Sequence, residues 1–221
     1  CSLIESAELM QYWEDGRWRP YDFDELLEVV VGCMASTPEY CRLTRVIRDI
    51  PGTDIVSGNR LTNFRQIAER EARERGASLR DIRAREVRGE GVEPDRLRLR
   101  EVRYATSVGV EVFLQSVTPE DKLAGFLRLS LPRKKVFLDE IESSAMIREV
   151  HVYGQVVSIG KRGASAAQHS GLGRALIERA ALLSREAGFA DLAVVSAVGT
   201  RQYYRGLGFT DGDLYQHRSL R

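Results

Sequence analysis

The chain has 221 residues, of which 43% are hydrophobic, so it can bury a sizeable core and hold one or two domains. Its 33 Lys and Arg residues balance 32 Asp and Glu residues, and a formal net charge of +1 excludes a chain that is strongly acidic or basic as a whole. No apolar run reaches the roughly 18 residues that a membrane-spanning helix needs, and no signal peptide is visible, so we expect a cytoplasmic protein with no membrane partner.

The charge is nevertheless uneven along the chain. Residues 1–41 contain two arginines and nine acidic residues, a net charge of −7, which leaves +8 for the remainder. Four of the 33 basic residues are lysines and the others are arginines, whose planar fork suits phosphate groups. This distribution hints at a polyanionic partner without proving one.

The first fifty residues predict two helices and a strand. A short helix over residues 7–13 ends at Gly16, and a longer one begins at the cap residue Asp22 and ends before Pro38. Residues 42–48 alternate in polarity as a strand does. Alternation of helix and strand is compatible with the last part of a β/α barrel.

The cysteines give no sign of a metal site or of a disulfide framework. Cys1, Cys33 and Cys41 are an odd number, which suits a reducing compartment better than disulfide bonds. Zinc normally takes four ligands, often with a Cys-x-x-Cys pair, and the sequence contains no such pair. We therefore expect buried structural thiols rather than metal ligands.

Residues 60–103 are rich in arginine. A predicted helix over residues 63–75 carries both Arg and Glu, for which a solvated face with ion pairs four residues apart is the preferred explanation. From Arg80 to Arg88 few acidic residues offset the arginines, and phosphate contact stays open there beside a solvated face. No aromatic residue interleaves with these arginines, so base stacking is not supported. Residues 89–95 indicate a linker to a second domain.

Four predicted strands follow this linker, and the third is ended by Pro132. The strands cover residues 97–104, 109–115, 124–131 and 147–153. A helix over residues 172–187, a buried strand at 192–195 and a short helix bounded by glycines come next. The pattern predicts an antiparallel meander that leads into a helix.

Residues 168–174, with the sequence Gln-His-Ser-Gly-Leu-Gly-Arg, join the meander to that helix. Gly171 and Gly173 let the backbone approach a bulky anion, because a Cβ there would collide with it. Unpaired N–H groups and the positive dipole end at the helix start attract phosphate oxygens. A dinucleotide fingerprint lacks its third glycine and its acidic residue, and an NTPase loop lacks Gly-Lys-Ser/Thr. We predict a diphosphate cradle; taken alone, the stretch is equally compatible with a glycine-rich turn.

The order strand, Gln-x-x-Gly-x-Gly, helix, strand and Tyr-x-x-x-Gly-Phe resembles GNAT-type acetyltransferases, whose core has the order β-β-β-β-α-β-α-β. Residues 149–154, 168–173 and 198–205 look more specifically like the catalytic-subunit family of Elongator. Two earlier stretches, residues 48–51 and 83–87, are also similar to that family.

The resemblance implies an α/β protein of two parts. Residues 1–93 would be the C-terminal portion of a radical-SAM β/α barrel with an arginine-rich linker, and residues 94–221 a GNAT acetyl-CoA-binding domain. Members of the family use S-adenosylmethionine and a 4Fe-4S cluster, whose cysteines lie further upstream. We therefore expect a fragment whose N-terminal domain is missing and which cannot perform radical chemistry by itself.

The resemblance also places an acetyl-CoA site. The backbone of residues 149–152 would pair with the pantetheine arm as an added strand, and the cradle would hold the diphosphate. The implied cofactor-binding residues are Glu149, Val150, His151, Val152, Gln168, His169, Gly171, Leu172, Gly173, Arg174 and Tyr204.

Four residues are candidates for catalysis. Tyr204 stands where many relatives carry a phenol that protonates the departing thiolate, and Tyr203 is less favoured, with ordinary packing as its alternative. Glu149 and His151 are two residues apart on a strand and so share a face, where they could activate a nucleophile or water. A strand histidine that only holds neighbouring backbone is the competing explanation.

By resemblance, the function is an acetyl-CoA-dependent modification of the wobble uridine of tRNA that forms a carboxymethyl group. This chain would supply acetyl-CoA binding and thioester cleavage, with the tRNA anticodon region and other Elongator-type subunits as partners. Two alternatives stay open. One is acetylation of a lysine amine, as on histones, and the other is a tRNA-binding module with a vestigial acetyl-CoA pocket, against which an intact Tyr204 argues.

Overall fold

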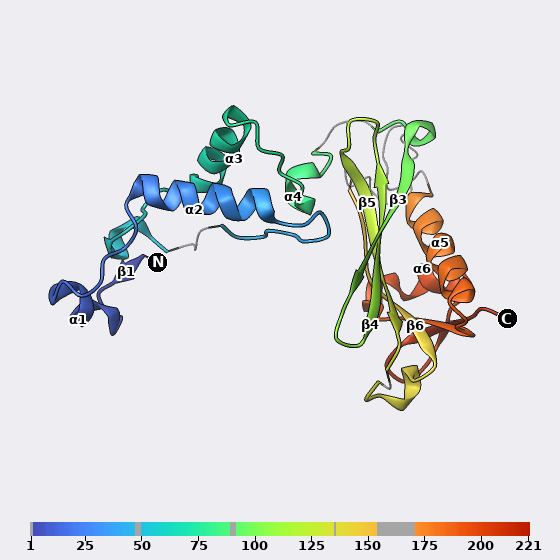
Figure 1. Ribbon diagram of the computed structural model, residues 1–221. Coiled ribbons are helices and arrows are strands. Elements are labelled where there is room, and N and C mark those ends of the chain that lie inside the picture. Colours follow the sequence, from blue (N-terminus) through green and yellow to red (C-terminus); the bar gives the residue numbers. More distant parts are fainter. Residues whose placement is uncertain (1, 47–49, 89–91, 135, 154–170) are drawn as a thin grey trace. The chain divides into compact units, whose positions relative to one another are not determined.

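A computed structural model of the chain describes all residues except 1, 47–49, 89–91, 135 and 154–170. The chain divides into a first unit, Cys1–Arg85, and a second unit, Glu86–Arg221 (Figure 1). Glu86 bridges to Leu123, and the Val87 amide donates to the Leu123 carbonyl at 3.1 Å. These two contacts join the start of the second unit to Leu123, and the domain boundary between residues 93 and 94 stays a prediction.

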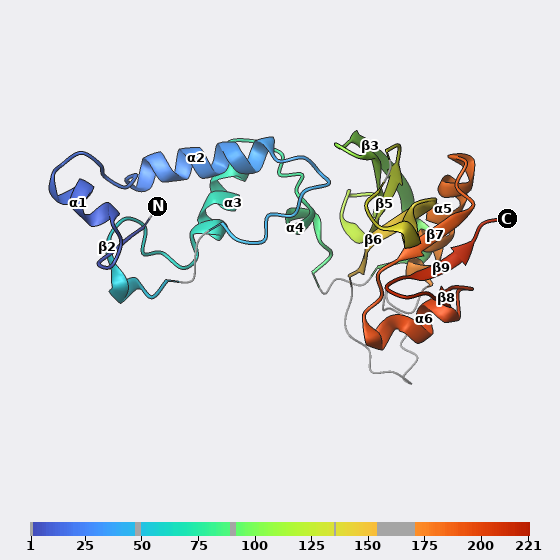
Figure 2. The same cartoon turned by 90° about the horizontal axis from the view of Figure 1, so that it is seen from below.

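The first unit consists of helices and one small sheet. Its elements are β1 (Leu3–Ile4), α1 (Leu9–Glu14), α2 (Phe23–Ser36), a 3-10 turn (Gly52–Asp54), β2 (Ile55–Ser57), α3 (Phe64–Glu74) and α4 (Ile82–Arg85). β1 and β2 pair antiparallel. α2 and α3 lie side by side (Figures 1 and 2), and apolar residues of both helices form a small core. That core contains Leu27, Val31, Met34, Phe64, Ala68 and Ala72.

The predicted start of α2 at Asp22 is confirmed. The Asp22 carboxylate accepts the Glu25 amide at 2.9 Å, and the Glu25 carboxylate accepts the Asp22 amide at 3.0 Å. This reciprocal capping box satisfies two N–H groups that the first helical turn would otherwise leave unpaired. The ion pairs predicted for the arginine-rich helix α3 are also present, from Arg65 to Glu69 and from Arg75 to Glu71.

The predicted strand over residues 42–48 is wrong for its described part, which is irregular up to Val46. Two of its carbonyl groups accept hydrogen bonds from arginine side chains. Arg65 donates to the Leu43 carbonyl at 2.5 Å, and Arg83 donates to the Thr44 carbonyl at 2.9 Å. Because arginine guanidinium groups bind these carbonyl oxygens, the segment forms no strand there despite its alternating side chains.

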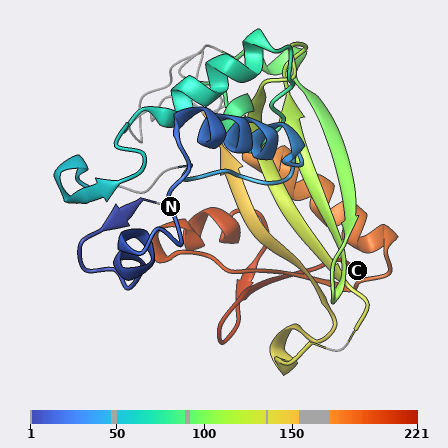
Figure 3. The same ribbon diagram turned by 60° about the vertical axis from the view of Figure 1, so that its left-hand side comes forward.

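The second unit is built on a seven-stranded sheet of order β3-β4-β5-β6-β7-β9-β8. The strands are β3 (Arg98–Ala105), β4 (Gly109–Val117), β5 (Leu123–Pro132), β6 (Ser144–Val152), β7 (Asp191–Val194), β8 (Thr210–Asp211) and β9 (Gln216–Ser219). Every pairing is antiparallel except that of β6 with β7. The long β3, β4 and β5 run beside one another (Figure 3), as the meander prediction requires.

Helix α5 (Leu172–Glu186) connects β6 to β7 and covers one face of the sheet (Figure 1). Its apolar stripe buries Leu176, Ile177 and Ala180 completely. Leu127 and Leu129 of β5, also fully buried, share the sheet face with Gly125, where an added Cβ would lie 3.3 Å from Leu172 Cδ2. The predicted order β-β-β-β-α-β-α is confirmed, with α6 (Arg201–Arg205) as the second helix.

Short 3-10 turns complete the second unit, at Pro94–Arg96, Asp139–Ile141 and Val198–Thr200. The sequence predicts one strand after the last helix, whereas the structure has the hairpin pair β8 and β9. Among the described parts of the chain, no helix is long and apolar enough to cross a bilayer.

Candidate functional site

The site begins where β6 and β7 separate. The two strands pair in parallel from Ser144 with Asp191 to Ile147 with Val194, where β7 ends. β6 continues to Val152 and pairs there with β5 on its other side. Within the described residues, the edge of β6 from Arg148 to Val152 therefore has no strand partner. An unpaired edge of this kind can accept an extended chain as an additional strand.

A β-bulge interrupts the pairing of β5 with β6 at this point. Arg128 lies opposite Glu149, but Leu129 lies opposite Ile147, so Arg148 is the extra residue. Arg148 contacts Glu111 and Glu149 contacts Arg128, so the bulge directs two consecutive side chains to the sheet face opposite α5. Glu149 and His151 share that face, as predicted, because their partners on β5 are Arg128 and Phe126.

The second component is the first turn of α5. Gly171 is its N-cap in a left-handed conformation with φ of 75°, and it supplies no side-chain cap. The first helical bond runs from the Ala175 amide to the Gly171 carbonyl at 2.9 Å. In the described parts of the chain, the amides of Leu172, Gly173 and Arg174 have no backbone acceptor. They point out of a helix start whose dipole favours an anion, beside the exposed Arg174 side chain.

Gln168 and His169, predicted to contact the cofactor, lie outside the described residues. Of the predicted cradle, the structure therefore describes only Gly171, Leu172, Gly173 and Arg174.

Three elements converge at Gly173. A Cβ built there would lie 2.7 Å from the Tyr203 hydroxyl oxygen and 3.7 Å from Val152 Cγ2. The end of β6, the first turn of α5 and helix α6 thus meet at one point. A side chain at this position would have to displace the Tyr203 phenol, which comes from a distant part of the chain.

The two tyrosines of α6 differ in exposure. Tyr204 is 8% exposed, and its ring packs edge-on against Phe209 at a centroid distance of 5.4 Å. Burial, and then the neighbouring Tyr203, raise the pKa of Tyr204 to about 12. Tyr203 is 47% exposed; burial raises its pKa, and the charge of Arg174 opposes that shift. Both phenols are therefore protonated at neutral pH and available as donors.

His151 and Glu149 do not contact each other by any hydrogen bond found among the described residues. The His151 ring stacks on Phe126 at 5.8 Å with an interplanar angle of 11°, and it lies 4.5 Å from the Tyr153 ring. Glu149 instead accepts from Arg128 Nε at 2.9 Å. The carboxylate and the imidazole therefore lie on one face, each with its own contacts, and their joint role in activating a nucleophile stays a prediction.

Sequence reasoning missed a polar network on this face. The Tyr104 hydroxyl donates to Glu111 at 2.7 Å and accepts from Arg128 at 3.4 Å, while Arg148 forms an ion pair with Glu111. Glu111 is only 3% exposed, so its charge depends on these partners. Burial, and then the bond to Glu111, raise the pKa of Tyr104 to about 12. The sequence signal for this network is a charged residue within an apolar strand, since Glu111 stands between two valines.

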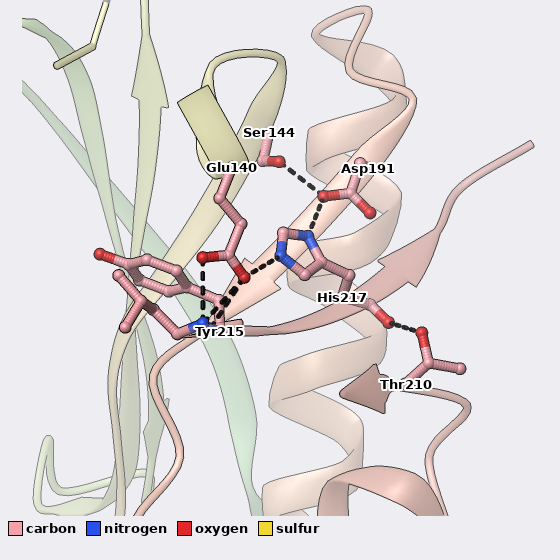
Figure 4. Close-up of polar contacts among 7 residues, drawn as sticks. Glu140, Ser144, Asp191, Thr210, Tyr215 and His217 are labelled. Atoms are coloured by element: carbon pink, nitrogen blue, oxygen red, sulfur yellow. Dashed lines mark hydrogen bonds and ion pairs between the residues drawn. The ribbon is translucent and has the colours of Figure 1, made fainter. Parts of the chain in front are cut away.

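A second polar cluster lies at the opposite ends of β6 and β7 (Figure 4). His217 of β9 contacts Asp191 at 2.8 Å and Glu140 at 3.3 Å, and Glu140 also accepts the amides of residues 214 and 215. Ser144 donates to Asp191 at 2.5 Å rather than to His217, so the cluster has no serine activated by a histidine. It holds the β8–β9 hairpin against the starts of β6 and β7.

Three of the arginines between positions 80 and 88 bind protein groups in the first unit. Arg80 and Arg85 both pair with Glu39, at 3.1 and 3.0 Å, and Arg85 is 5% exposed. Arg83 donates to the Thr44 carbonyl. These contacts favour a structural role for the segment over the phosphate contact left open by the sequence. Cys33 is exposed and Cys41 is partly exposed, both as free thiols, so the expected burial of these thiols is wrong.

Comparisons with known proteins agree with this architecture. The family model described as the Radical_SAM C-terminal domain matches residues 1–74. The chain is 36% identical over 214 residues to a tRNA uridine(34) acetyltransferase of Dehalococcoides mccartyi (strain CBDB1), covering 94% of this chain and 46% of that protein. It is likewise 36% identical over 214 residues to Elongator complex protein 3 of Mus musculus, covering 94% of this chain and 39% of the relative.

A solved structure is similar over almost the whole chain. The archaeal Methanocaldococcus infernus Elp3 with an N-terminal deletion superposes with a TM-score of 0.88 at 33% identity, covering 99% of this chain and 54% of that one. The chain spans less than half the length of the two relatives from Dehalococcoides mccartyi and Mus musculus. Both units, and not the seven-stranded sheet alone, therefore lie within the part of the chain that matches this structure.

Proposed function

We propose a function for this chain from the premise that it belongs to the family of the Elongator catalytic subunit and the tRNA uridine(34) acetyltransferases, whose C-terminal part it matches. The proposed function is acetyl-CoA binding and thioester cleavage within an acetyl-CoA-dependent modification of the wobble uridine of tRNA. The observation that carries it is the start of α5, which has no side-chain cap, beside the edge of β6 that β7 leaves unpaired, with the Tyr203 hydroxyl at the same point and the Tyr204 ring 5.4 Å from the Tyr203 ring.

The chain's own residues fit a coenzyme A thioester. The amides of Leu172, Gly173 and Arg174, which have no backbone acceptor among the described residues, and the Arg174 guanidinium suit a diphosphate. The backbone of β6 from Arg148 to Val152, whose edge beyond β7 has no partner in the described part of the chain, suits the amide-bearing pantetheine arm, which can be bound as an extended strand. When bound, acetyl-CoA supplies an activated acetyl group; the protein contributes binding, orientation and proton donation.

Tyr204 is the proposed proton donor to the sulfur as the thioester is cleaved. A pKa of about 12 keeps its hydroxyl protonated in the physiological range, which a donor requires. Tyr203 is proposed as a positioning residue, because its hydroxyl fills the space beside Gly173 and so fixes the first turn of α5 against α6. Glu149, with one oxygen held by Arg128, is proposed to orient the attacking water or acceptor.

We assign S-adenosylmethionine and a 4Fe-4S cluster to the part of the longer family members that this chain does not match. Among the residues that the structure describes, no three His, Cys, Asp or Glu side chains are grouped to hold a metal ion. The match of residues 1–74 to a Radical_SAM C-terminal domain supports the first unit as the end of such a domain. The tRNA anticodon region and other Elongator-type subunits are its proposed partners.

Hydrolysis of acetyl-CoA by the 221-residue chain tests the proposal. We expect release of free CoA that rises when tRNA is added and does not rise with a histone peptide. CoA release that responds to the peptide and not to tRNA would instead support acetylation of a lysine. Absence of both CoA binding and hydrolysis would contradict the proposed function.

A further inference from the structure

Arg128 lies at the centre of the polar network on the sheet face opposite α5. Its guanidinium carbon lies 5.1 Å from the ring centroid of Phe113 and 5.6 Å from that of Phe126, two rings that are completely buried. The Tyr104 hydroxyl accepts from its Nη1 at 3.4 Å. Arg128 is thereby restrained by neighbours on β3, β4 and on its own strand, and its side chain is only 16% exposed.

Glu149 is held on one side only. Its Oε2 accepts from Arg128 Nε at 2.9 Å, and none of the described residues forms a hydrogen bond with Oε1. The side chain is 39% exposed and belongs to the part of β6 that β7 leaves unpaired. The carboxylate thus has one fixed oxygen and one accessible oxygen at the open edge of the strand.

From this geometry we propose that Arg128 is a positioning residue that fixes the direction of the free Glu149 oxygen, and that Tyr104 supports Arg128 in this role. The inference rests on the proposed function, because it concerns the same site. The free oxygen accepts a hydrogen bond from the water or the acceptor group that attacks the thioester, and so selects an N–H or O–H donor at that position.

The arginine fork is required for this arrangement. Arginine can donate from Nε to the carboxylate and from Nη1 to the phenol while its flat face covers two rings. Lysine would keep the charge but offers a point donor that cannot satisfy both groups from one plane. Arg128→Lys and Arg128→Gln are therefore expected to have similar consequences, which a purely electrostatic role would not produce.

A double-mutant cycle on acetyl-CoA hydrolysis tests the proposal. We expect Arg128→Gln and Arg128→Lys each to lower kcat by about tenfold or more, with KM for acetyl-CoA changed by less than about threefold. In the Glu149→Gln background, Arg128→Gln should change kcat by less than about twofold, because the residue through which it acts is already altered. Arg179→Gln is the matched control, since Arg179 forms an ion pair with Glu101 at 2.6 Å away from the site and should leave kcat unchanged.

A readout independent of activity accompanies the cycle. In the NMR spectrum of the nitrogen-labelled chain, the Arg128 Nε–H should be slow to exchange with solvent, and Glu149→Ala should abolish that protection. Equal losses of kcat from Arg128→Gln in the wild-type and Glu149→Gln backgrounds would overturn the role proposed for Arg128, and so would an unprotected Arg128 Nε–H in the wild type. Either result would leave the proposed function standing. A wild-type chain that neither binds CoA nor hydrolyses acetyl-CoA would overturn the proposed function, and this inference with it.

Discussion

Gly171 and Gly188 offer a matched pair of perturbations at the two ends of α5. Both have positive φ angles, 75° and 90°, and a Cβ added at either would have no neighbour within 4 Å among the residues that the structure describes. Replacement by alanine therefore introduces backbone strain without a steric clash. Such strain amounts to roughly 1–2 kcal/mol per residue for an L-amino acid in the left-handed region.

Both variants should lose similar stability. A loss of about 1–2 kcal/mol lowers the unfolding midpoint by roughly 2–8 °C for a chain of this size, which thermal unfolding can resolve. The two variants should differ in affinity for CoA. Gly171 precedes the amides of Leu172 to Arg174 that have no acceptor in the described part of the chain, whereas the Gly188 amide closes the other end of α5 by donating to the Arg185 carbonyl at 2.9 Å.

Gly171→Ala should weaken CoA binding by about ten- to a hundredfold, because a hydrogen bond to a charged group contributes roughly 1.5–3 kcal/mol and one or more would be misaligned. Gly188→Ala should change the affinity by less than about twofold in the same calorimetric titration. If both variants bind CoA equally well after equal losses of stability, the amides at the start of α5 do not hold the diphosphate.

Three further predictions follow from the pKa values and contacts. Tyr204→Phe should lower acetyl-CoA turnover by about a hundredfold and leave CoA affinity within about twofold, whereas Tyr203→Phe should weaken binding; turnover unchanged in Tyr204→Phe would remove the proton donor. Burial alone would lower the pKa of His217, but its two carboxylate neighbours outweigh this and raise it. Their contribution to stability is therefore complete below the unfolded pKa of about 6.5 and is lost as pH rises through the folded value, and urea unfolding of His217→Gln should lack this dependence. Tyr104→Phe removes a partner of the buried Glu111 and should cost about 1–3 kcal/mol in denaturant unfolding; a loss near zero would mean that water replaces the phenol.

Most of the sheet could be predicted from the sequence because its strands alternate strongly and are bounded by turn residues. The α5 helix could be predicted from apolar spacing, and its start from Gly171 and Gly173. The reason for Gly173 could not, since it depends on the Tyr203 hydroxyl, which arrives from a helix 30 residues further along the chain. The local sequence pattern around Gly173 does not predict its contact with Tyr203.

Two other features depend on long-range contacts. The predicted strand over residues 42–48 is wrong for its described residues 42–46, where arginines from α3 and α4 bind the carbonyl groups of Leu43 and Thr44. The network around Arg128 depends on cross-strand register and on the bulge at Arg148, which a simple period of two does not reveal. The bulge also places Arg148 beside Glu149 on one face, where strict alternation would separate them.

The most direct test of the account is a titration of CoA into the nitrogen-labelled chain, observed by NMR. We predict that the amide signals of Leu172, Gly173 and Arg174 shift most, together with those at the open edge of β6 up to Val152. We predict no comparable shift near His217, at the opposite end of these strands. Shifts that spare the first turn of α5, or that gather elsewhere in the chain, would contradict the central claim that this helix start holds the diphosphate.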